Sequence, residues 1–445
     1  MATQLNRFTQ WARESPQRQY NALMGMLADP DGLRESFERQ AANKAPGVDG
    51  VRKADYAEAL QDRLEDLSAR LRRLGYRPKP SRRVYIPKAS GGHRALGIPS
   101  FEDRIVQDRL SQILQSIWEP EFRDCSYGFR PGRNAHQALR RLAEVVTINR
   151  TQWIVEADIK GFFDNVTHEH LKRFLAHRIA DQLFLRVIDR FLKAGVLEDG
   201  RTVASEQGTP QGGLVSPVLA NIYLHYVLDI WFEKRYAKSC GGAAHLVRYA
   251  DDFVACFQKE SDAKRFVEEL HERLASFGLE VEPTKTAMLR FGDLAMARCK
   301  QEGRKRPQTF HFLGFTHFAA RSRSGRFVVG RKTQSERMRK KLKEMNERLS
   351  SMRTQGGRAM LEFVHRHLQG HLQYYGVSGN SRSLRQYAHK VRRILFKWIN
   401  RRSQRRSASW ERFDKMVAPY LPKIRIIHNL YPSPKWTTQT GSRMG

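Results

Sequence analysis

The spacing of hydrophobic residues along the chain predicts helices in several separate segments. Between residues 57 and 74, apolar residues recur at intervals of three and four, and Gly75 follows as a helix-ending residue. Residues 1–75 as a whole have this helical character. Further segments with helical spacing occupy residues 103–117, 168–195, 216–236 and 261–277.

Three other segments have the composition of β-strands. Residues 153–159 form a short apolar run, which predicts a buried strand. Residues 83–98 have strand-forming positions on both sides of Ser90-Gly91-Gly92 and predict a hairpin. Residues 245–257 are apolar on both sides of the pair Asp251-Asp252, which places two carboxylates at the turn of a second hairpin.

The pattern changes at about residue 330, where basic helices replace the mixture of helices and strands. These helices are expected at residues 331–353, 357–375 and 381–402, and a polar insertion or linker is expected before them at residues 298–308. We therefore predict an α+β fold over the first 320 residues and an almost entirely helical remainder.

Composition adds a strong positive charge to this picture. The 445 residues include 79 Lys and Arg against 46 Asp and Glu, which gives a net charge of +33. Protein surfaces usually balance both signs, so the excess indicates a polyanionic partner such as nucleic acid, bound in a salt-sensitive way. The four cysteines form no C-x-x-C pair, and no apolar run has the length of a signal-peptide core or a membrane span. We expect a cytoplasmic protein with no membrane partner.

Three acidic residues stand at the ends of predicted strands. Asp158 follows one apolar strand, and Asp251 and Asp252 lie between two others, so neighbouring antiparallel strands would bring Asp158 and Asp251 together. Adjacent carboxylates repel each other unless a cation lies between them, and Mg²⁺ binds carboxylate oxygens together with substrate phosphates. Polymerases use two such ions to activate a primer hydroxyl and stabilise pyrophosphate. Taken alone, the residues also fit a solvated Asp-Asp turn and a helix N-cap at Asp158.

Other residues fit nucleotide binding near these acids. Phe163 follows Asp158 by five residues, and a bulky ring there would clash with a ribose 2′-OH and select deoxynucleotides; a core phenylalanine is the alternative. The glycine-rich loop at residues 207–213 leaves room for a nucleotide to approach the backbone. Lys88 and Arg94 flank the glycine hairpin and fit either a triphosphate, as charged donors, or a solvated hairpin.

Seven short motifs follow one another in order between about residues 44 and 316. They are Ala45-Pro-Gly-Val-Asp-Gly50, Ile86-Pro-Lys88 with Arg94-Ala-Leu-Gly-Ile-Pro99, Tyr127-Gly-Phe-Arg-Pro131, Asp158 with Phe163, Thr209-Pro-Gln-Gly212, Tyr249-Ala-Asp-Asp252 and Phe312-Leu-Gly-Phe315. This ordered set resembles the reverse transcriptase/maturases of bacterial group II introns. Leu368-Gln-Gly-His-Leu-Gln-Tyr-Tyr-Gly376 and Trp398-Ile-Asn-Arg-Arg-Ser-Gln-Arg-Arg406 resemble the thumb, or maturase, segment of that family.

The resemblance implies a right-hand polymerase, with fingers, a palm built on an antiparallel sheet, and an all-helical thumb/maturase domain. It divides the chain into an N-terminal helical extension at 1–75, fingers and palm at 76–320, the thumb at 330–404 and a basic tail at 405–445, which we expect to bind DNA. Many relatives carry a C-terminal Cys/His endonuclease. The chain ends at Gly445 with no cysteine after Cys299, so we expect a form without that module, in which nicking of target DNA comes from another factor or is not needed.

The same resemblance assigns roles to individual residues. The catalytic acids would be Asp158, Asp251 and Asp252. A site for two Mg²⁺ ions, with Mn²⁺ as a substitute, would be formed by Asp158, Ile159, Asp251 and Asp252, with Asp158 and Asp251 as the direct ligands. Phe163 would be the sugar gate, and the backbone near Phe312–Phe315 would help to grip the primer. The incoming dNTP would be contacted by Lys88, Arg94, Gln211 and Lys285.

The expected function is an RNA-directed DNA polymerase that makes cDNA and binds group II intron RNA to assist splicing and mobility. Its expected partners are group II intron RNA, an RNA template with a DNA or RNA primer, target DNA and dNTPs. Two other functions stay open at the level of sequence. One is a domesticated reverse transcriptase in phage defence or DNA repair, and the other is a splicing maturase with little polymerase role, against which the intact acids argue.

Overall fold

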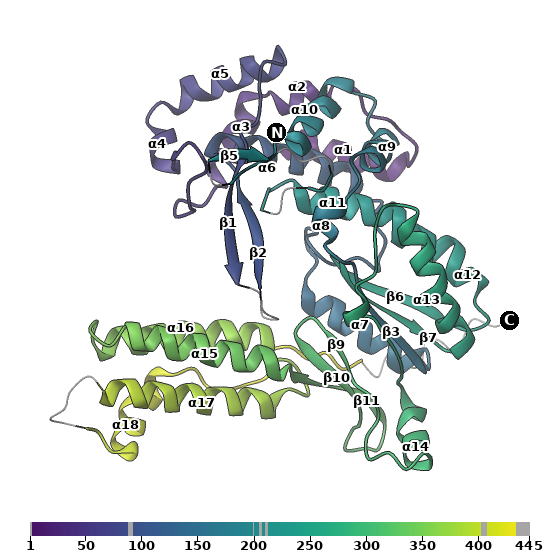
Figure 1. Cartoon of the computed structure of the whole chain (residues 1–445), viewed down its shortest axis with the longest axis vertical. Helices are drawn as coiled ribbons and strands as arrows, with labels where there is room; N and C mark the ends of the chain where they lie inside the picture. Colours follow the sequence, from purple (N-terminus) through teal and green to yellow (C-terminus); the bar gives the residue numbers. More distant parts are fainter. Residues whose placement is uncertain are drawn as a thin grey trace.

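The computed structural model describes residues 2–87, 92–198, 200–203, 207–209, 212–401 and 407–432. Figure 1 shows a helical N-terminal part at the top, a sheet covered by helices at the right, and a separate group of long helices at the lower left. Helices and antiparallel sheets are mixed up to residue 333, and helices dominate beyond it, which confirms the predicted α+β class. None of the helices in the described ranges combines the length and apolar character needed to cross a membrane.

The N-terminal helices share one hydrophobic core with the fingers and with one face of the palm sheet. The predicted helix at 57–74 begins only at Leu60, because Ala59 before it has a non-helical backbone (φ −129°, ψ 47°). The longest helix of this core has an N-cap, in which the Ser100 hydroxyl accepts a hydrogen bond from Asp103 N. The helices are α1 (Ala2–Glu14), α2 (Leu23–Leu27), α3 (Pro30–Glu38), α4 (Lys53–Ala57), α5 (Leu60–Arg72) and α6 (Phe101–Trp118).

The fingers contain the predicted hairpin. Strands β1 (Ser81–Pro87) and β2 (His93–Ile98) are antiparallel, and β1 also pairs in parallel with β4 (Val196–Glu198), which is followed by β5 (Arg201–Val203). The hairpin points from the fingers toward the long helices below it (Figure 1). Its end approaches them, since Lys340 Nζ donates to the carbonyl of Pro87 at 3.5 Å.

The palm is a four-stranded antiparallel sheet in the order β6-β7-β3-β8. Alternate residues of β3 and β7 enter different hydrophobic cores, with Val155 and Phe253 in one and Ile154 and Val254 in the other. Both faces are therefore buried, which explains why these strands are continuous apolar runs. The strands are β3 (Trp153–Asp158), β6 (Ala244–Tyr249), β7 (Asp252–Phe257) and β8 (Ala287–Arg290).

The palm helices within 168–195, 216–236 and 261–277 follow the predicted segments, whereas no helix was predicted at residues 135–148. The helix expected at 216–236 continues without a break, but two of its turns are π-helical, at His225–Asp229 and Phe232–Tyr236. The remaining helices are α7 (Ala135–Ile148), α8 (Phe162–Asn165), α9 (His168–Ala176), α10 (Gln182–Lys193), α11 (Ser216–Leu224), α12 (Ala237–Ser239) and α13 (Glu260–Ala275).

One predicted boundary between residues 298 and 335 is wrong, because the helix expected from Arg331 begins only at Ser335. The insertion or linker expected at 298–308 overlaps the last residues of α14 (Asp293–Gln301). Arg331 belongs instead to a strand, where its side chain is fully buried. This strand is part of a small antiparallel sheet of β9 (Phe310–Phe312), β10 (Phe315–Arg321) and β11 (Phe327–Thr333).

The long helices at the lower left of Figure 1 pack around a third hydrophobic core. They are α15 (Ser335–Ser351), α16 (Gly357–Tyr375), α17 (Ser381–Asn400) and α18 (Trp410–Val417), followed by a 3₁₀ turn at Ala418–Tyr420. Part of the segment expected as a basic tail therefore adds a helix to this core. The chain then returns along α16, where Val377 pairs with His428 and Leu430 is fully buried.

Candidate active site

The three expected acids lie at one end of the palm sheet. Asp158 is the last residue of β3 and is paired across the sheet with Asp252, the first residue of β7. Tyr249 pairs with Asp252 on the other side, so Ala250 and Asp251 form a two-residue turn. Ala250 has a left-handed φ of 58°, as such a turn requires. The structure therefore confirms the predicted hairpin and brings its turn beside the end of β3.

A buried ion pair, which the sequence patterns did not reveal, supports this turn. The side chains of Arg248 and Asp229 are fully buried, and Arg248 Nε donates to Asp229 Oδ1 at 2.7 Å. Arg248 also donates to the Ser126 hydroxyl at 2.8 Å and to the carbonyl of Ala250 at 3.0 Å. Because a buried guanidinium requires partners for its donors, the network fixes the backbone of the turn. The available signal was an arginine inside the apolar run at 245–257.

Several carboxyl groups oppose one another's ionisation at this end of the sheet. Burial, as the largest cause, and the charges of Asp158, Asp251 and Glu156 together raise the pKa of Asp252 to about 8. A hydrogen bond from the backbone of Leu313 to Asp252 acts in the opposite direction. Burial, as the largest cause, and the charge of Asp158 raise the pKa of Glu156 to about 7, against a hydrogen bond from the backbone of His311 that lowers it. Concentrated negative charge of this kind favours the binding of a cation.

Lys285 provides positive charge beside these acids. It ends the 3₁₀ turn Pro283–Lys285, and its ammonium forms an ion pair with Asp158 Oδ2. Burial acts to lower the pKa of Lys285, but the hydrogen bond and the charge of Asp158 outweigh it, so that the pKa is raised. Lys285, which the resemblance placed near the triphosphate, is thus found on the carboxylate of Asp158.

The carboxylates at this end of the sheet suit Mg²⁺, provided that water and substrate supply the remaining ligands. Within the described ranges, no three His, Cys, Asp or Glu side chains are grouped closely enough to hold an ion by themselves. Mg²⁺ commonly takes one or two carboxylates and fills its other positions with water and substrate phosphates. Asp158 and Asp251 are two such carboxylates. Ile159 continues the chain beyond Asp158, and its backbone is held by pairing with Val281.

Phe163 and the glycine-rich loop are held against each other. Phe163 lies in α8, is half-buried, and meets the ring of Phe162 edge-on at 5.5 Å between centroids. The backbone N–H of Thr209 donates to the carbonyl of Phe163 at 2.7 Å. Gly208 has a φ of 88°, and a Cβ there would lie 2.9 Å from the same carbonyl. Only glycine permits this approach, so the loop sequence fixes the backbone of Phe163.

Three of the residues expected to contact the dNTP have side chains outside the described part of the structure. Lys88 and Gln211 lie outside the described residues, as does the side chain of Arg94, although its backbone belongs to β2. At the far end of the glycine-rich loop, Gly212 has a φ of 112°, and a Cβ there would lie 2.3 Å from the carbonyl of Gly97 in β2. The loop and the fingers hairpin are therefore in direct contact.

The segment Phe312–Phe315 is the turn that joins β9 to β10. Leu313 and Gly314 have left-handed φ values of 49° and 79°, as a two-residue hairpin turn requires. Through the hydrogen bond between Leu313 and Asp252, this turn lies directly beside the acids. The position is compatible with the expected contact to a primer.

Comparison with known proteins places most of this site within one conserved type of domain. A family model described as "Reverse transcriptase (RNA-dependent DNA polymerase)" matches residues 86–317. Protein YkfC from Escherichia coli is 38% identical over 232 residues, which are 51% of this chain and 61% of that protein. Group II intron-encoded protein LtrA from Lactococcus lactis is 36% identical over 222 residues, 50% of this chain and 37% of LtrA.

More distant similarities extend to a plant protein and to a solved structure. Nuclear intron maturase 1 of Arabidopsis thaliana is 27% identical over 214 residues, 44% of this chain and 30% of that protein. The chain thus spans less than two thirds of the length of each of these relatives. A structure of apo telomerase from Candida tropicalis covers 57% of this chain and 55% of its own, with 15% identity and a TM-score of 0.42.

Proposed function

This chain belongs to the reverse transcriptase family, and we propose that it is an RNA-directed DNA polymerase that makes cDNA from dNTPs. The observation that carries the proposal is the meeting of Asp158, Asp251 and Asp252 at one end of the palm sheet, inside the residues that match the family. Nucleotide transfer develops negative charge on the attacking and leaving oxygens, and acids from two neighbouring strands suit the placing of cations there.

In this proposal, Asp158 and Asp251 are the carboxylate ligands of two Mg²⁺ ions, for which Mn²⁺ can substitute, and Ile159 and Asp252 complete the site. The bound ions would promote ionisation of the primer hydroxyl and neutralise the departing pyrophosphate. The contribution of the surrounding residues is to hold these acids in position. Arg248 holds the turn that carries Asp251, and Leu313 holds the carboxylate of Asp252. Lys285 balances the charge of Asp158 until substrate is bound.

The remaining residues would select and hold the dNTP. Phe163 is the proposed sugar gate, because its backbone is fixed by Thr209 within five residues of Asp158. The triphosphate would be bound by Lys88, Arg94, Gln211 and Lys285. The direct contact between β2 and the glycine-rich loop supports the grouping of Arg94 with Gln211, since it unites the two segments that carry them.

A second role is proposed from the relatives. LtrA is described as a group II intron-encoded protein, and the Arabidopsis relative as an intron maturase. We therefore propose that this chain also binds group II intron RNA and target DNA, and assists splicing and mobility. The net charge of +33 supports a polyanionic partner with salt-sensitive binding.

Primer extension by the purified chain tests the polymerase proposal. With a primed RNA template, dNTPs and Mg²⁺, the wild type should make cDNA, and Asp251→Asn should make none. Asp62→Asn, an exposed substitution in α5, is the matched control and should retain activity. A wild type without activity, or an active Asp251→Asn variant, would refute the polymerase. A splicing assay then separates the roles, because Asp251→Asn should still promote splicing of its intron RNA.

A further inference from the structure

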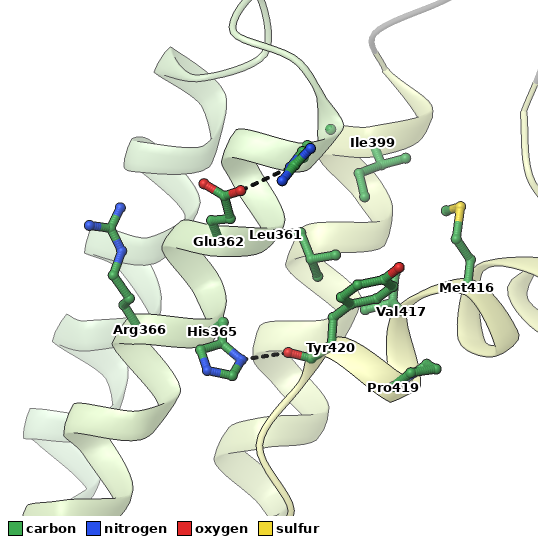
Figure 2. Close-up of a pocket in the computed structure, with 11 residues that line it drawn as sticks. Leu361, Glu362, His365, Arg366, Ile399, Met416, Val417, Pro419 and Tyr420 are labelled. Atoms are coloured by element: carbon green, nitrogen blue, oxygen red, sulfur yellow. Dashed lines mark hydrogen bonds and ion pairs between the residues drawn. The ribbon is translucent and has the colours of Figure 1, made fainter.

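A long groove runs between α16 on one side and, on the other, the end of α18 and the segment that follows it. Its first part is a hollow of about 1100 Å³, lined by α16 from Gly357 to Arg366, by Ile399, and by residues 416–420 (Figure 2). A second hollow of about 440 Å³ continues along α16 to Gln373, with residues 422–427 as its other wall. Because Arg366 lines both hollows, they form one continuous surface, which we call the thumb groove.

The walls of the thumb groove are held in place. Near its apolar end, His365 Nδ1 is in hydrogen-bond contact with the carbonyl of Tyr420, as Figure 2 shows. Farther along, the backbone N–H groups of Ile427 and His428 both donate to the carbonyl of Gly376, at 2.7 and 2.9 Å. The segment is therefore packed against α16, so a ligand would meet a formed surface and cost little ordering on binding.

The first hollow is apolar and has an aromatic wall. In Figure 2, Leu361 of α16 and Tyr420 of the opposite wall point into the same space, next to Met416 and Pro419. The side chains of Tyr420 and Met416 are 61% and 50% exposed. Half of the exposed large hydrophobic residues in the described part of the chain lie between residues 410 and 431, and three of these line the thumb groove: Met416, Tyr420 and Ile427. Such a concentration on a highly charged protein marks an interaction surface.

The second hollow carries positive charge. Its lining includes the cations Arg366, Lys423 and Arg425 and the amides Gln369 and Gln373, and contains no acid. The acid of the first hollow, Glu362, is paired with Arg358 at 3.1 Å. An apolar, aromatic recess that continues into an acid-free row of cations complements a chain with planar bases and regular phosphates.

We propose that the thumb groove binds an unpaired RNA segment, with a base stacked on Tyr420 and the adjoining phosphates on Arg366, Lys423 and Arg425. A duplex buries the faces of its bases, so the recess favours a single strand. The choice of RNA as the polyanion rests on the proposed function. The lining contains none of the candidate active-site residues, so this RNA would be held at a separate site from the nucleotide being added.

The test measures binding apart from synthesis. The full chain carrying Asp251→Asn is mixed with fluorescent oligouridylate, and saturating unlabelled primed template occupies the polymerase site. Tyr420→Ala should weaken binding of the oligouridylate about five- to 150-fold, which is the range for loss of one stacked base. Tyr420→Phe keeps the ring and should bind like the parent. Both variants should melt at the parent's temperature, because the Tyr420 side chain is mostly exposed.

Charge is tested with a paired substitution. Lys423→Gln with Arg425→Gln should reduce the slope of log affinity against log salt by about 1.4, since each phosphate contact of a single strand contributes about 0.7. Arg323→Gln, which removes one exposed charge in the turn between β10 and β11, should leave the slope unchanged. An equal loss of slope in both would overturn the proposal, because it would show only the effect of overall charge.

Three further results would also overturn it. These are unchanged oligouridylate binding by Tyr420→Ala, equal affinity for oligodeoxyuridylate, and loss of self-association in place of RNA binding, which would assign the groove to a second copy of the chain. Failure of the polymerase proposal is distinguishable from all three. The polymerase proposal fails if the wild type does not extend a primer. The single variant Tyr420→Ala, with Asp251 intact, should extend a short primed template normally.

Discussion

The hydroxyl of Tyr374, in α16, donates a hydrogen bond of 2.9 Å to the carbonyl of Leu313. Leu313 in turn bonds the carboxylate of Asp252 through its backbone, so a single residue separates the thumb helix from the palm acids. Tyr374 makes a second contact with the palm, because its backbone carbonyl lies 2.8 Å from Nε2 of His136 in α7. The position of α16 is therefore coupled to the position of an acid in the candidate active site.

Tyr374→Phe should slow nucleotide addition with little effect on the KM for dNTP. The lost hydrogen bond is worth about 0.5–1.5 kcal/mol, which corresponds to about a two- to ten-fold fall in kcat if the turn moves with Asp252. Primer extension under single-turnover conditions measures it. Tyr387→Phe is the control, since it removes a comparable bond to His367 within the thumb core (2.7 Å). An equal fall in both variants would assign the effect to thumb stability.

Breaking the Arg248–Asp229 pair should destabilise the palm strongly. Arg248→Met leaves the Asp229 carboxylate buried without its cation, and loss of one partner of a buried pair costs about 3–5 kcal/mol. The melting temperature should fall in Arg248→Met and in Asp229→Leu, and should recover in the double variant, in which neither charge is buried alone. A double variant that melts as low as the single variants would show that the hydrogen bonds of Arg248 to the turn carry the stability.

The acids could be predicted from sequence because their information is local. Asp158 and Asp251 each adjoin a short apolar strand, and a polar residue at the end of a buried strand stands out from the pattern. The order of the motifs, through the family that it resembles, then predicted that these strands belong to one palm sheet. Arg248 shows the limit, because its partner Asp229 lies on a helical segment, and no local pattern indicates which acid meets an arginine inside the core.

Residue 331 shows the same limit for the fold. A basic residue before a basic helix was assigned to that helix, but Arg331 lies in β11 and is fully buried, with Nη2 donating to the carbonyl of Leu139 at 3.2 Å. Tertiary packing of α7 on the small sheet decides this, and it overrides local composition. Lys285 is a similar case in the candidate site. Its sequence position was recognised, whereas its pairing with Asp158 depends on how the 3₁₀ turn meets β3.

The raised pKa of Asp252 predicts that stability falls as pH rises. The folded carboxyl group keeps its proton up to about pH 8, whereas an aspartate in the unfolded chain has the ordinary value of 3.8. The folded state therefore binds more protons between these values, and the free energy of unfolding must decrease with increasing pH across that window. The fall in melting temperature between about pH 5 and about pH 8 should be smaller in Asp252→Asn than in the wild type. Equal falls would contradict the assignment.

Mg²⁺ should reverse part of this loss. Metal ions bind ionised carboxylates, and a ligand that binds only the folded state raises its stability. Added Mg²⁺ should therefore raise the melting temperature more at about pH 8 than at about pH 6, and Asp251→Asn should reduce the increase. A pH-independent increase that persists in Asp251→Asn would locate the bound ions elsewhere.

The size of the side chain at position 163 should set the selectivity for deoxynucleotides. Phe163→Leu and Phe163→Ala progressively remove bulk, so the ratio of ribonucleotide to deoxynucleotide incorporation should rise in that order. Measuring the ratio within one enzyme preparation cancels any loss of folded protein, which matters because the ring is half-buried. An unchanged ratio in both variants would leave Phe163 as a packing residue beside Phe162.

Substitution of Lys285 should separate two of its proposed roles. The ammonium occupies Asp158, so Lys285→Ala should lower the Mg²⁺ concentration for half-maximal activity, by about two- to five-fold for an ion pair this exposed. If Lys285 moves to the triphosphate when substrate binds, the same variant should raise the KM for dNTP. Lys160→Ala is the matched control, because it removes an exposed pair with Glu280 at 3.1 Å close to the same strand. A change in Mg²⁺ dependence alone would restrict Lys285 to balancing the charge of Asp158, and equal effects in both variants would contradict both roles.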